Sequence, residues 1–449
     1  MAKWLLFFLM CGVAPALGQA EPVKPIATAD TATVSVTDKQ IRSLQARVKE
    51  TPADYAAYDG LGSAFFQKAR ETGDIAYYDL AEQTLKKGLD LVPQDFRAAD
   101  PLVHMALVYM GEHRFTEALA YAQKAISIGS GNLPAFAIEG DAYTDMGDYD
   151  EAAAAYNTLQ TLGRAVSSPL ALAYMSDSRI AYLRFLHGDS VGAIGLMKNA
   201  ITAALQANMP RENLAWLYFE LGERYFQSGD LENAGLSYQS GLAADPAHYR
   251  SLGGLAKVRA AQGEFEESIE LYRRSIAILP FPVYVEELGD VYRKVGREKE
   301  AQQQYDLVEY IGHLSALNRV LANRELALFY ADQGIKLPEG LELARKEFEV
   351  RHDIYTWDTL AWVLYKNGRF QEAYEAMEKA LSLRTNDPLL RFHAGMISHA
   401  VAKDSEAEGF LSRALKTNPH FHIFHAETAS QTLAEISRSH GDTRSSNAK

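Results

Sequence analysis

The chain repeats itself at a fixed interval, and this repetition limits the possible folds more than any other feature of the sequence. Residues 140–159 contain small and aromatic residues at fixed intervals. The small residues are Gly140, Gly147 and Ala152, and the aromatic residues are Tyr143 and Tyr156. Residues 221–246 repeat the same order at the same spacing: Gly222, Tyr225, Gly229, Ala234 and Tyr238. Extended along the chain, the pattern gives about ten units of roughly 34 residues each.

Each unit predicts two amphipathic helices joined by a tight turn. Gly147 and Gly229 fall at this turn, where a left-handed backbone ends the first helix at little cost for glycine. A small residue such as Gly140 lets the two helices approach closely, and we expect Tyr143 to fill the space beside that contact. Pro246 ends its unit, because proline cannot continue a helix. One helix pair cannot cover its own apolar face, so neighbouring pairs must stack.

The pattern resembles the tetratricopeptide repeat, whose signature is W-x2-L-G-x2-Y…A-x3-F…A…P. Trp357 with Leu360 fits the first helix of that signature, and Ala234, Tyr238 and Pro246 fit the second. The resemblance implies an all-α fold, a right-handed α-solenoid of about ten helix-turn-helix repeats over residues 51–425.

Short helices are expected to cap both ends of the array. Residues 36–50 contain a capping box, Thr37-x-x-Gln40, followed by an apolar face, and predict an N-terminal capping helix. Residues 426–437 predict a C-terminal capping helix. The polar residues 438–449 predict a disordered tail.

The first twenty residues have the layout of a secretory signal peptide. Lys3 precedes an apolar run at residues 4–13, and small residues follow. Residues 21–35 are rich in Pro, Ala and Thr and predict a disordered linker. The single cysteine, Cys11, lies in the signal peptide, so the mature chain would contain no thiol. We therefore expect an exported protein, periplasmic or extracellular, from a Gram-negative bacterium.

Composition and motifs exclude several function classes. The net charge of −13 argues against nucleic-acid binding, which needs a concentrated basic face. After residue 20 no apolar stretch is long enough to predict a membrane span. The chain has no nucleophile elbow, phosphate-binding loop, dinucleotide fingerprint or H-E-x-x-H motif. The sequence therefore predicts no enzyme activity and no cofactor.

Residues 419–425 read PHFHIFH and are the one candidate for metal chemistry. A zinc or nickel site would use three imidazoles: His420, His422 and His425. The alternative, which we favour, is that these rings pack with Phe421 and Phe424 over the last repeat as a C-terminal seal.

The resemblance also implies that the first helix of each pair lines a concave, ligand-binding surface. The aromatic residues expected there are Tyr182, Phe185, Trp216, Phe219, Phe226, Tyr355, Trp362, Tyr365 and Phe392. The basic residues expected there are Arg250, Lys257 and Arg293. Exposed rings on a rigid wall favour a peptide, an apolar helix or a sugar. Closure of the superhelix would instead bury them as core.

These features predict a non-enzymatic scaffold of the cell envelope that binds a protein or peptide partner in the concave groove. An accessory protein for polysaccharide handling or secretion is the alternative, with the rings stacking on sugar. A metal-binding or enzyme-associated subunit is the third possibility. The identity of the partner and the oligomeric state stay open.

Overall fold

The computed structural model describes residues 35–93, 95–166, 168–317 and 323–446. The predicted signal peptide, and the linker up to residue 34, lie outside this range. Within it the chain forms twenty-two α-helices and one short 3-10 helix (Phe96–Ala98), with no strand. The predicted all-α fold class is confirmed. No helix in the described ranges is both long enough and apolar enough to cross a bilayer.

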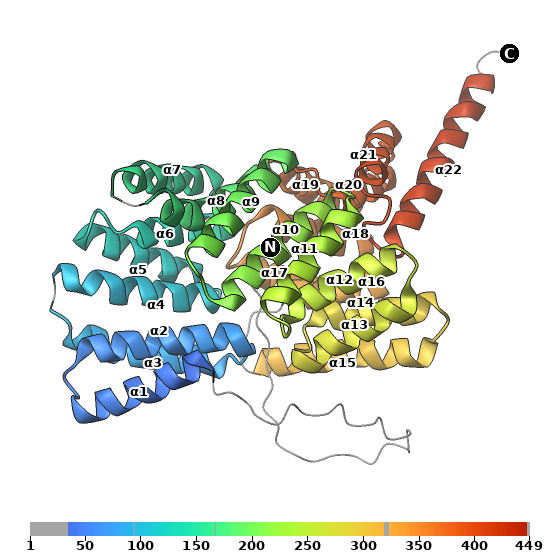
Figure 1. Cartoon of the computed structure of the whole chain (residues 1–449). Coiled ribbons are helices and arrows are strands. Elements are labelled where there is room, and N and C mark those ends of the chain that lie inside the picture. Colours follow the sequence, from blue (N-terminus) through green and yellow to red (C-terminus); the bar gives the residue numbers. More distant parts are fainter. Residues whose placement is uncertain (1–34, 94, 167, 318–322, 447–449) are drawn as a thin grey trace, which may run out of the picture.

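Ten consecutive helix pairs, here called repeats one to ten, form the body of the described structure (Figure 1). The first helices of the pairs are α2 (Tyr55–Thr72), α4 (Ala99–Gly111), α6 (Leu133–Met146), α8 (Pro169–Leu186), α10 (Arg211–Gln227), α12 (Tyr249–Ala261), α14 (Pro282–Lys294), α16 (Asn323–Gln333), α18 (Ile354–Lys366) and α20 (Pro388–Ala400). The second helices are α3 (Ala76–Leu91), α5 (Phe115–Ile128), α7 (Tyr149–Val166), α9 (Ser190–Gln206), α11 (Leu231–Ala244), α13 (Phe265–Ile278), α15 (Glu298–Leu317), α17 (Leu337–Phe348), α19 (Phe370–Ala380) and α21 (Asp404–Thr417).

The N-terminal helix α1 (Val36–Glu50) packs against α2, but its cap differs from the predicted capping box. Ser35, and not Thr37, is the capping residue, since its hydroxyl accepts a hydrogen bond from the Asp38 backbone N–H at 3.0 Å. The Thr37 hydroxyl instead donates to Glu71 on α2 at 2.6 Å. The side chain predicted to cap the helix therefore ties it to the first repeat.

The C-terminal helix α22 (His425–Ser446) continues past residue 437, where we expected it to end. In Figure 1 it projects from the body of the molecule. Residues 438–446 lack an apolar period, which is why their sequence suggested a tail. Once the preceding turns are helical, however, each further residue adds a hydrogen bond without a new nucleation cost.

Contacts between glycine and an aromatic ring hold the two helices of a repeat together. A Cβ on Gly140 would lie 2.2 Å from the Tyr156 ring, and one on Gly222 would lie 2.5 Å from the Tyr238 ring. The ring that fills the space therefore comes from the second helix. Tyr143, which we expected to fill it, stays only partly buried.

The solenoid is coiled so tightly that its later repeats lie directly on its earlier ones. The turn glycines of repeats three, four and five are Gly147, Gly188 and Gly229. A Cβ at these positions would lie 2.5, 3.0 and 2.4 Å from the backbone oxygens of His352, Arg384 and Thr417, which lie at the ends of repeats eight, nine and ten. Each turn thus meets the loop after the repeat five places later, and the second coil of the superhelix packs on the first.

Hydrogen bonds cross this contact, which we call the seam. The Asn386 side chain donates to the Gly188 carbonyl at 2.7 Å, and the Asn418 side chain donates to the Phe226 carbonyl at 2.8 Å. The Ile354 backbone N–H donates to the Tyr149 hydroxyl at 2.9 Å. The bonded residues are 192 to 205 positions apart in the sequence. The seam is therefore a specific polar contact between distant repeats.

Candidate functional site

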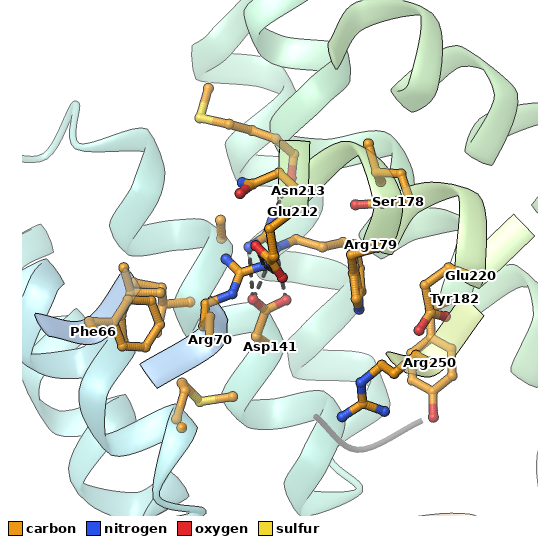
Figure 2. A pocket seen from close by; sticks show the side chains of 18 of the residues that line it. Phe66, Arg70, Asp141, Ser178, Arg179, Tyr182, Glu212, Asn213, Glu220 and Arg250 are labelled. Atoms are coloured by element: carbon orange, nitrogen blue, oxygen red, sulfur yellow. Dashed lines mark hydrogen bonds and ion pairs between the residues drawn. The ribbon is translucent and has the colours of Figure 1, made fainter. Parts of the chain in front are cut away.

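Closure of the coil turns the concave surface of repeats one to six into a cavity of about 350 Å³ (Figure 2). Most of its wall comes from the first helices of these repeats, α2 to α12, and the second helices add Tyr78, Tyr156 and Met197. The large apolar and aromatic side chains in the walls include Phe66, Tyr78, Met110, Tyr174, Trp216 and Tyr249. A recess of this size, mostly apolar with a few polar groups, is typical of a ligand-binding pocket.

Two ion pairs cross the cavity wall (Figure 2). Arg70 on α2 donates to Glu212 on α10 at 2.9 Å and links residues 142 positions apart. Arg179 on α8 forks onto the Asp141 carboxylate of α6, with nitrogen–oxygen distances of 2.8 and 2.9 Å. Because each of these charges already has a partner, the pairs fix the distance between helices and do not demand a charged ligand.

Asn213 is an uncharged polar residue of the cavity wall that lacks part of its hydrogen bonding. Its amide nitrogen donates to the Tyr174 hydroxyl at 2.7 Å. Its buried side-chain oxygen has no hydrogen-bond partner among the described residues. A buried acceptor left in this state costs about 1–3 kcal/mol. Because this oxygen has almost no exposed surface, a ligand N–H would recover that energy only after the amide side chain turns toward the cavity.

His248 does not add a positive charge to the cavity. Burial, together with the nearby Arg250 and Arg70, lowers the pKa of His248 to about 3. The ring is therefore neutral at pH 7, and its Nδ1 lies 2.8 Å from the Ser251 hydroxyl. Arg250 is a cation beside His248, and its guanidinium lies 5.2 Å from the Tyr249 ring centre.

Of the twelve predicted groove residues, three line this cavity: Tyr182, Trp216 and Arg250. Five others are core residues with 1–4% of their surface exposed: Phe185, Phe219, Phe226, Trp362 and Phe392. For these five residues the alternative prediction holds: closure of the superhelix buries their rings as core. They cannot contact a ligand unless the surrounding core repacks. One reason is Arg224, itself 1% exposed, whose guanidinium lies 4.1 Å from the Phe185 ring centre.

The other four predicted groove residues are half-buried and make contacts within the chain. Lys257 bonds to Glu223 at 3.0 Å, and the Tyr355 hydroxyl donates to Asp387 at 3.2 Å. The last two, Tyr365 and Arg293, lie near the C-terminal segment 419–425: Tyr365 stacks on Trp362, and Arg293 lies against Phe424. Contact of these four residues with a partner stays a prediction.

The histidines of segment 419–425 are not gathered as metal ligands. His420 is exposed, whereas the rings of His422 and His425 stack with centres 4.0 Å apart. In the described ranges, the one group of three ligand atoms close enough for a shared ion belongs to Asp79, Glu82 and Glu112. Two members of that group are already bonded to Arg114.

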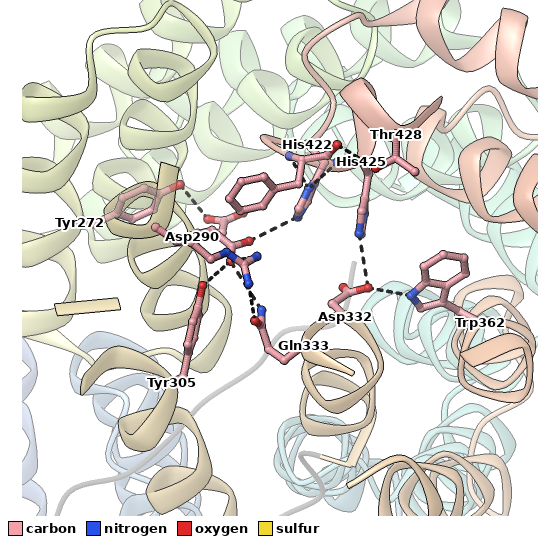
Figure 3. A network of polar contacts seen from close by, with 12 residues as sticks. Tyr272, Asp290, Tyr305, Asp332, Gln333, Trp362, His422, His425 and Thr428 are labelled. Carbon is pink, nitrogen blue, oxygen red and sulfur yellow. Dashed lines mark hydrogen bonds and ion pairs between the residues drawn. The ribbon is translucent and has the colours of Figure 1, made fainter. Parts of the chain in front are cut away.

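The segment does pack as a seal, but over more than the last repeat. The His422 Nε2 lies 3.7 Å from Asp290 of repeat seven, and the His425 Nε2 lies 3.5 Å from Asp332 of repeat eight (Figure 3). The segment thus reaches back across the concave surface of repeats seven to ten.

Glu287 on α14 provides a test of how deeply the interior is desolvated. Burial raises the pKa of Glu287 to about 7, although Lys257 and a 2.9 Å hydrogen bond from Tyr272 oppose the shift. A carboxyl group with a raised pKa stabilises the fold at low pH and loses that contribution as the pH rises from 4.5 to 7. Glu287→Gln keeps an acceptor for Tyr272 but cannot ionise. Between pH 4.5 and 7 we therefore expect the free energy of unfolding of this variant to fall by about 1–2 kcal/mol less than that of wild type. Urea unfolding at a series of pH values measures it, and parallel curves for the two proteins would show that Glu287 is solvated.

The fold and the cavity together define a class of protein, an α-solenoid of paired helices with a recessed interior surface. The repeats can also be named. Tetratricopeptide repeat family models match residues 133–162, 219–281 and 354–387, which lie in repeats three, five with six, and nine. These comparisons support the assignment of the chain to the tetratricopeptide repeat family.

Two curated relatives come from Arabidopsis thaliana. The chain is 23% identical over 254 residues to anaphase-promoting complex subunit 7, covering 56% of this chain and 41% of that protein. It is 23% identical over 212 residues to the protein CTR9 homolog, covering 45% of this chain and 19% of that protein. The chain therefore spans less than half the length of either relative.

Several solved structures are also similar to this chain. The yeast Tom70 structure matches with a TM-score of 0.41 and 11% identity, covering 90% of this chain and 97% of that one. A tetratricopeptide repeat protein from Parabacteroides merdae matches with a TM-score of 0.33 and 19% identity, covering 59% and 98%. The Cut9–Hcn1 hetero-tetramer of the APC/C matches with a TM-score of 0.32 and 12% identity, covering 88% and 92%.

The residues that sequence reasoning missed are the polar ones of the cavity: Arg70, Arg179, Glu212 and Asn213. A signal for one of them was present. Asn213 precedes Trp216 by three positions, and Glu220 follows Trp216 by four, so all three lie on one face of α10. Arg70 and Glu212 carry no such signal, because their pairing depends on closure of the coil.

Proposed function

We propose that this protein is a non-enzymatic scaffold that binds a protein partner through the cavity of repeats one to six. The observation that carries the proposal is the unpaired Asn213 oxygen on an aromatic wall that also contains Trp216. When the amide side chain turns toward the cavity, a peptide backbone supplies the N–H that this oxygen lacks, and an apolar side chain fits beside the rings. One relative is by its name a subunit of a complex, which accords with a role in an assembly.

We also propose that the protein acts in the cell envelope, as the signal-peptide pattern of residues 1–20 suggests. The partner is then an envelope protein that presents a short peptide or a helix end. Stacking of the cavity rings on a sugar remains the second candidate.

A pull-down from envelope extract tests the proposal. The wild-type protein is expected to recover one stoichiometric protein, and Asn213→Ala/Trp216→Ala is expected to weaken that binding at least tenfold, about 1.4 kcal/mol. Tyr310→Ala, on the outer helix α15 where Tyr310 is 53% exposed, is the control and should bind like wild type. Equal recovery by all three proteins would contradict the proposal. Tryptophan fluorescence that responds to oligosaccharide but not to peptide would favour the second candidate.

A further inference from the structure

The C-terminal segment 419–425 lies on the concave surface of repeats seven to ten in the manner of a bound peptide (Figure 3). The Phe421 ring is 7% exposed and lies 5.7 Å from the ring of Phe392 on α20. The His425 ring stacks on the same Phe392 at 4.7 Å. Phe424 lies 4.4 Å from the guanidinium of Arg293 on α14. Aromatic side chains at several positions therefore anchor one short segment to opposite sides of the groove.

The floor beneath this segment is acidic. Asp290 accepts hydrogen bonds from Tyr305 at 2.8 Å and from Arg293 at 3.2 Å, and Asp332 accepts one from Trp362 at 2.7 Å. Burial raises the pKa of Asp290 to about 6. Burial, together with the nearby Asp290 and Asp332, also raises the pKa of Glu286 well above its ordinary value.

The two imidazoles that cover this floor do not neutralise it. His422 Nδ1 accepts hydrogen bonds from the backbone N–H groups of Phe424 and His425, each at 3.2 Å, so Nδ1 carries no proton. The His422 ring is then neutral and turns Nε2 toward Asp290. The buried Nδ1 of His425 has no hydrogen-bond partner among the described residues. Segment 419–425 thus matches the groove in shape, but it brings no cation to an acidic floor on which, within the described part of the chain, Arg293 alone pairs with Asp290 as a cation, at 3.2 Å.

We propose that the concave surface of repeats seven to ten is a second peptide-binding groove, that segment 419–425 occupies it as a tethered ligand, and that a basic, aromatic partner segment displaces it. Such a partner carries aromatic side chains where Phe421 and Phe424 lie. It carries Lys or Arg where His422 and His425 lie, so that full positive charges meet Asp290 and Asp332. The tether gives segment 419–425 a high effective concentration, so a partner must bind the groove more tightly than the segment does.

Labelled peptides and the full-length chain test this proposal. The first peptide has the sequence of residues 417–430, the second carries H422R/H425R, and the third carries H422Q/H425Q. The receptor is the full chain with Phe421→Asp/His425→Asp, which places carboxylates against the ring of Phe392 and beside Asp332 to release the segment. By fluorescence anisotropy at pH 7.5, we expect the arginine peptide to bind this receptor at least tenfold more tightly than the glutamine peptide. Wild-type protein should bind each peptide at least tenfold more weakly than the receptor does.

Two controls separate charge recognition from loss of structure. Asp290→Asn/Asp332→Asn in the same receptor should abolish the preference for the arginine peptide. If the receptor variant does not fold, hydrogen exchange on wild-type protein replaces it: saturating arginine peptide should speed exchange of the amides of residues 420–428. Absence of peptide binding to a folded receptor, equal binding of the arginine and glutamine peptides, or unchanged exchange in wild-type protein would each overturn the proposal.

Discussion

Gly229→Ala is expected to destabilise the protein by about 1–3 kcal/mol more than Gly263→Ala. Both glycines end the first helix of a repeat with φ of +81°, so the backbone cost of alanine is the same at both, about 1–2 kcal/mol. At Gly229 the new Cβ would also lie 2.4 Å from the backbone oxygen of Thr417, which cannot move without opening the seam. At Gly263 no described atom lies within 4 Å of that position.

Urea unfolding of the two variants beside wild type measures this difference. If both variants lose the same free energy of unfolding, equal to the backbone cost alone, repeat five does not touch the end of repeat ten in solution. Gly147 and Gly296 offer a second pair with the same contrast: a Cβ at Gly147 would meet the His352 oxygen at 2.5 Å, whereas Gly296 is open to the described structure.

Arg351→Met is expected to cost about 3–5 kcal/mol, because it removes a fully buried cation from the seam. Arg351 is 0% exposed and follows α17 of repeat eight. Its guanidinium lies 2.8 Å from His113 Nδ1 and 4.7 Å from the Phe115 ring centre, both in repeat two. Glu347, 1% exposed and 3.7 Å away, would lose this counter-charge.

Arg345→Met, on the helix α17 that Arg351 follows, is the matched control. Arg345 is 48% exposed and pairs with Glu342 at 3.3 Å, and exposed pairs of this kind contribute about 0–1 kcal/mol. The double change Arg351→Met/Glu347→Gln should recover only part of the loss, since it removes the charge of Glu347 but leaves Asp353 and Asp145, which lie 3.7 and 4.0 Å from Arg351. A small effect of Arg351→Met, equal to that of Arg345→Met, would show that Arg351 is solvated and that the seam is open there.

The repeat itself could be predicted from the sequence because its determinants are local. The spacing of Gly140 and Tyr156 sets one helix pair, and the left-handed φ of Gly147 and Gly229 follows from their position at the turn. The number of repeats follows from the period. The ring that covers Gly140 was assigned to Tyr143 because spacing within one helix does not show what the partner helix contributes.

The seam could not be predicted, because its contacts join residues about 200 positions apart and follow from the curvature of the superhelix. Small rotations between successive repeats add up over five repeats, and no local pattern fixes their sum. One signal exists in retrospect. Thr385-Asn386 and Thr417-Asn418 stand at the ends of two successive repeats, and both asparagines bond across the seam.

The same limit applies to the candidate site. The rule that first helices face inward identified Tyr182, Trp216 and Arg250 as cavity residues. It could not show that Phe185 and Phe219 on the same helices are covered, since closure of the coil decides which inward side chains meet an open space. The position of segment 419–425 on repeats seven to ten depends on the same closure.

The central claim, that the second coil of the solenoid packs directly on the first, is tested most directly by one distance measurement. Nitroxide labels at His187→Cys and Ser382→Cys, in a Cys11→Ser background, flank the contact between Gly188 and the loop before α20; both label sites are exposed. Pulsed electron paramagnetic resonance should give a single short, narrow distance distribution. A long or broad distribution, as in an open superhelix, would contradict the claim and with it the cavity of repeats one to six.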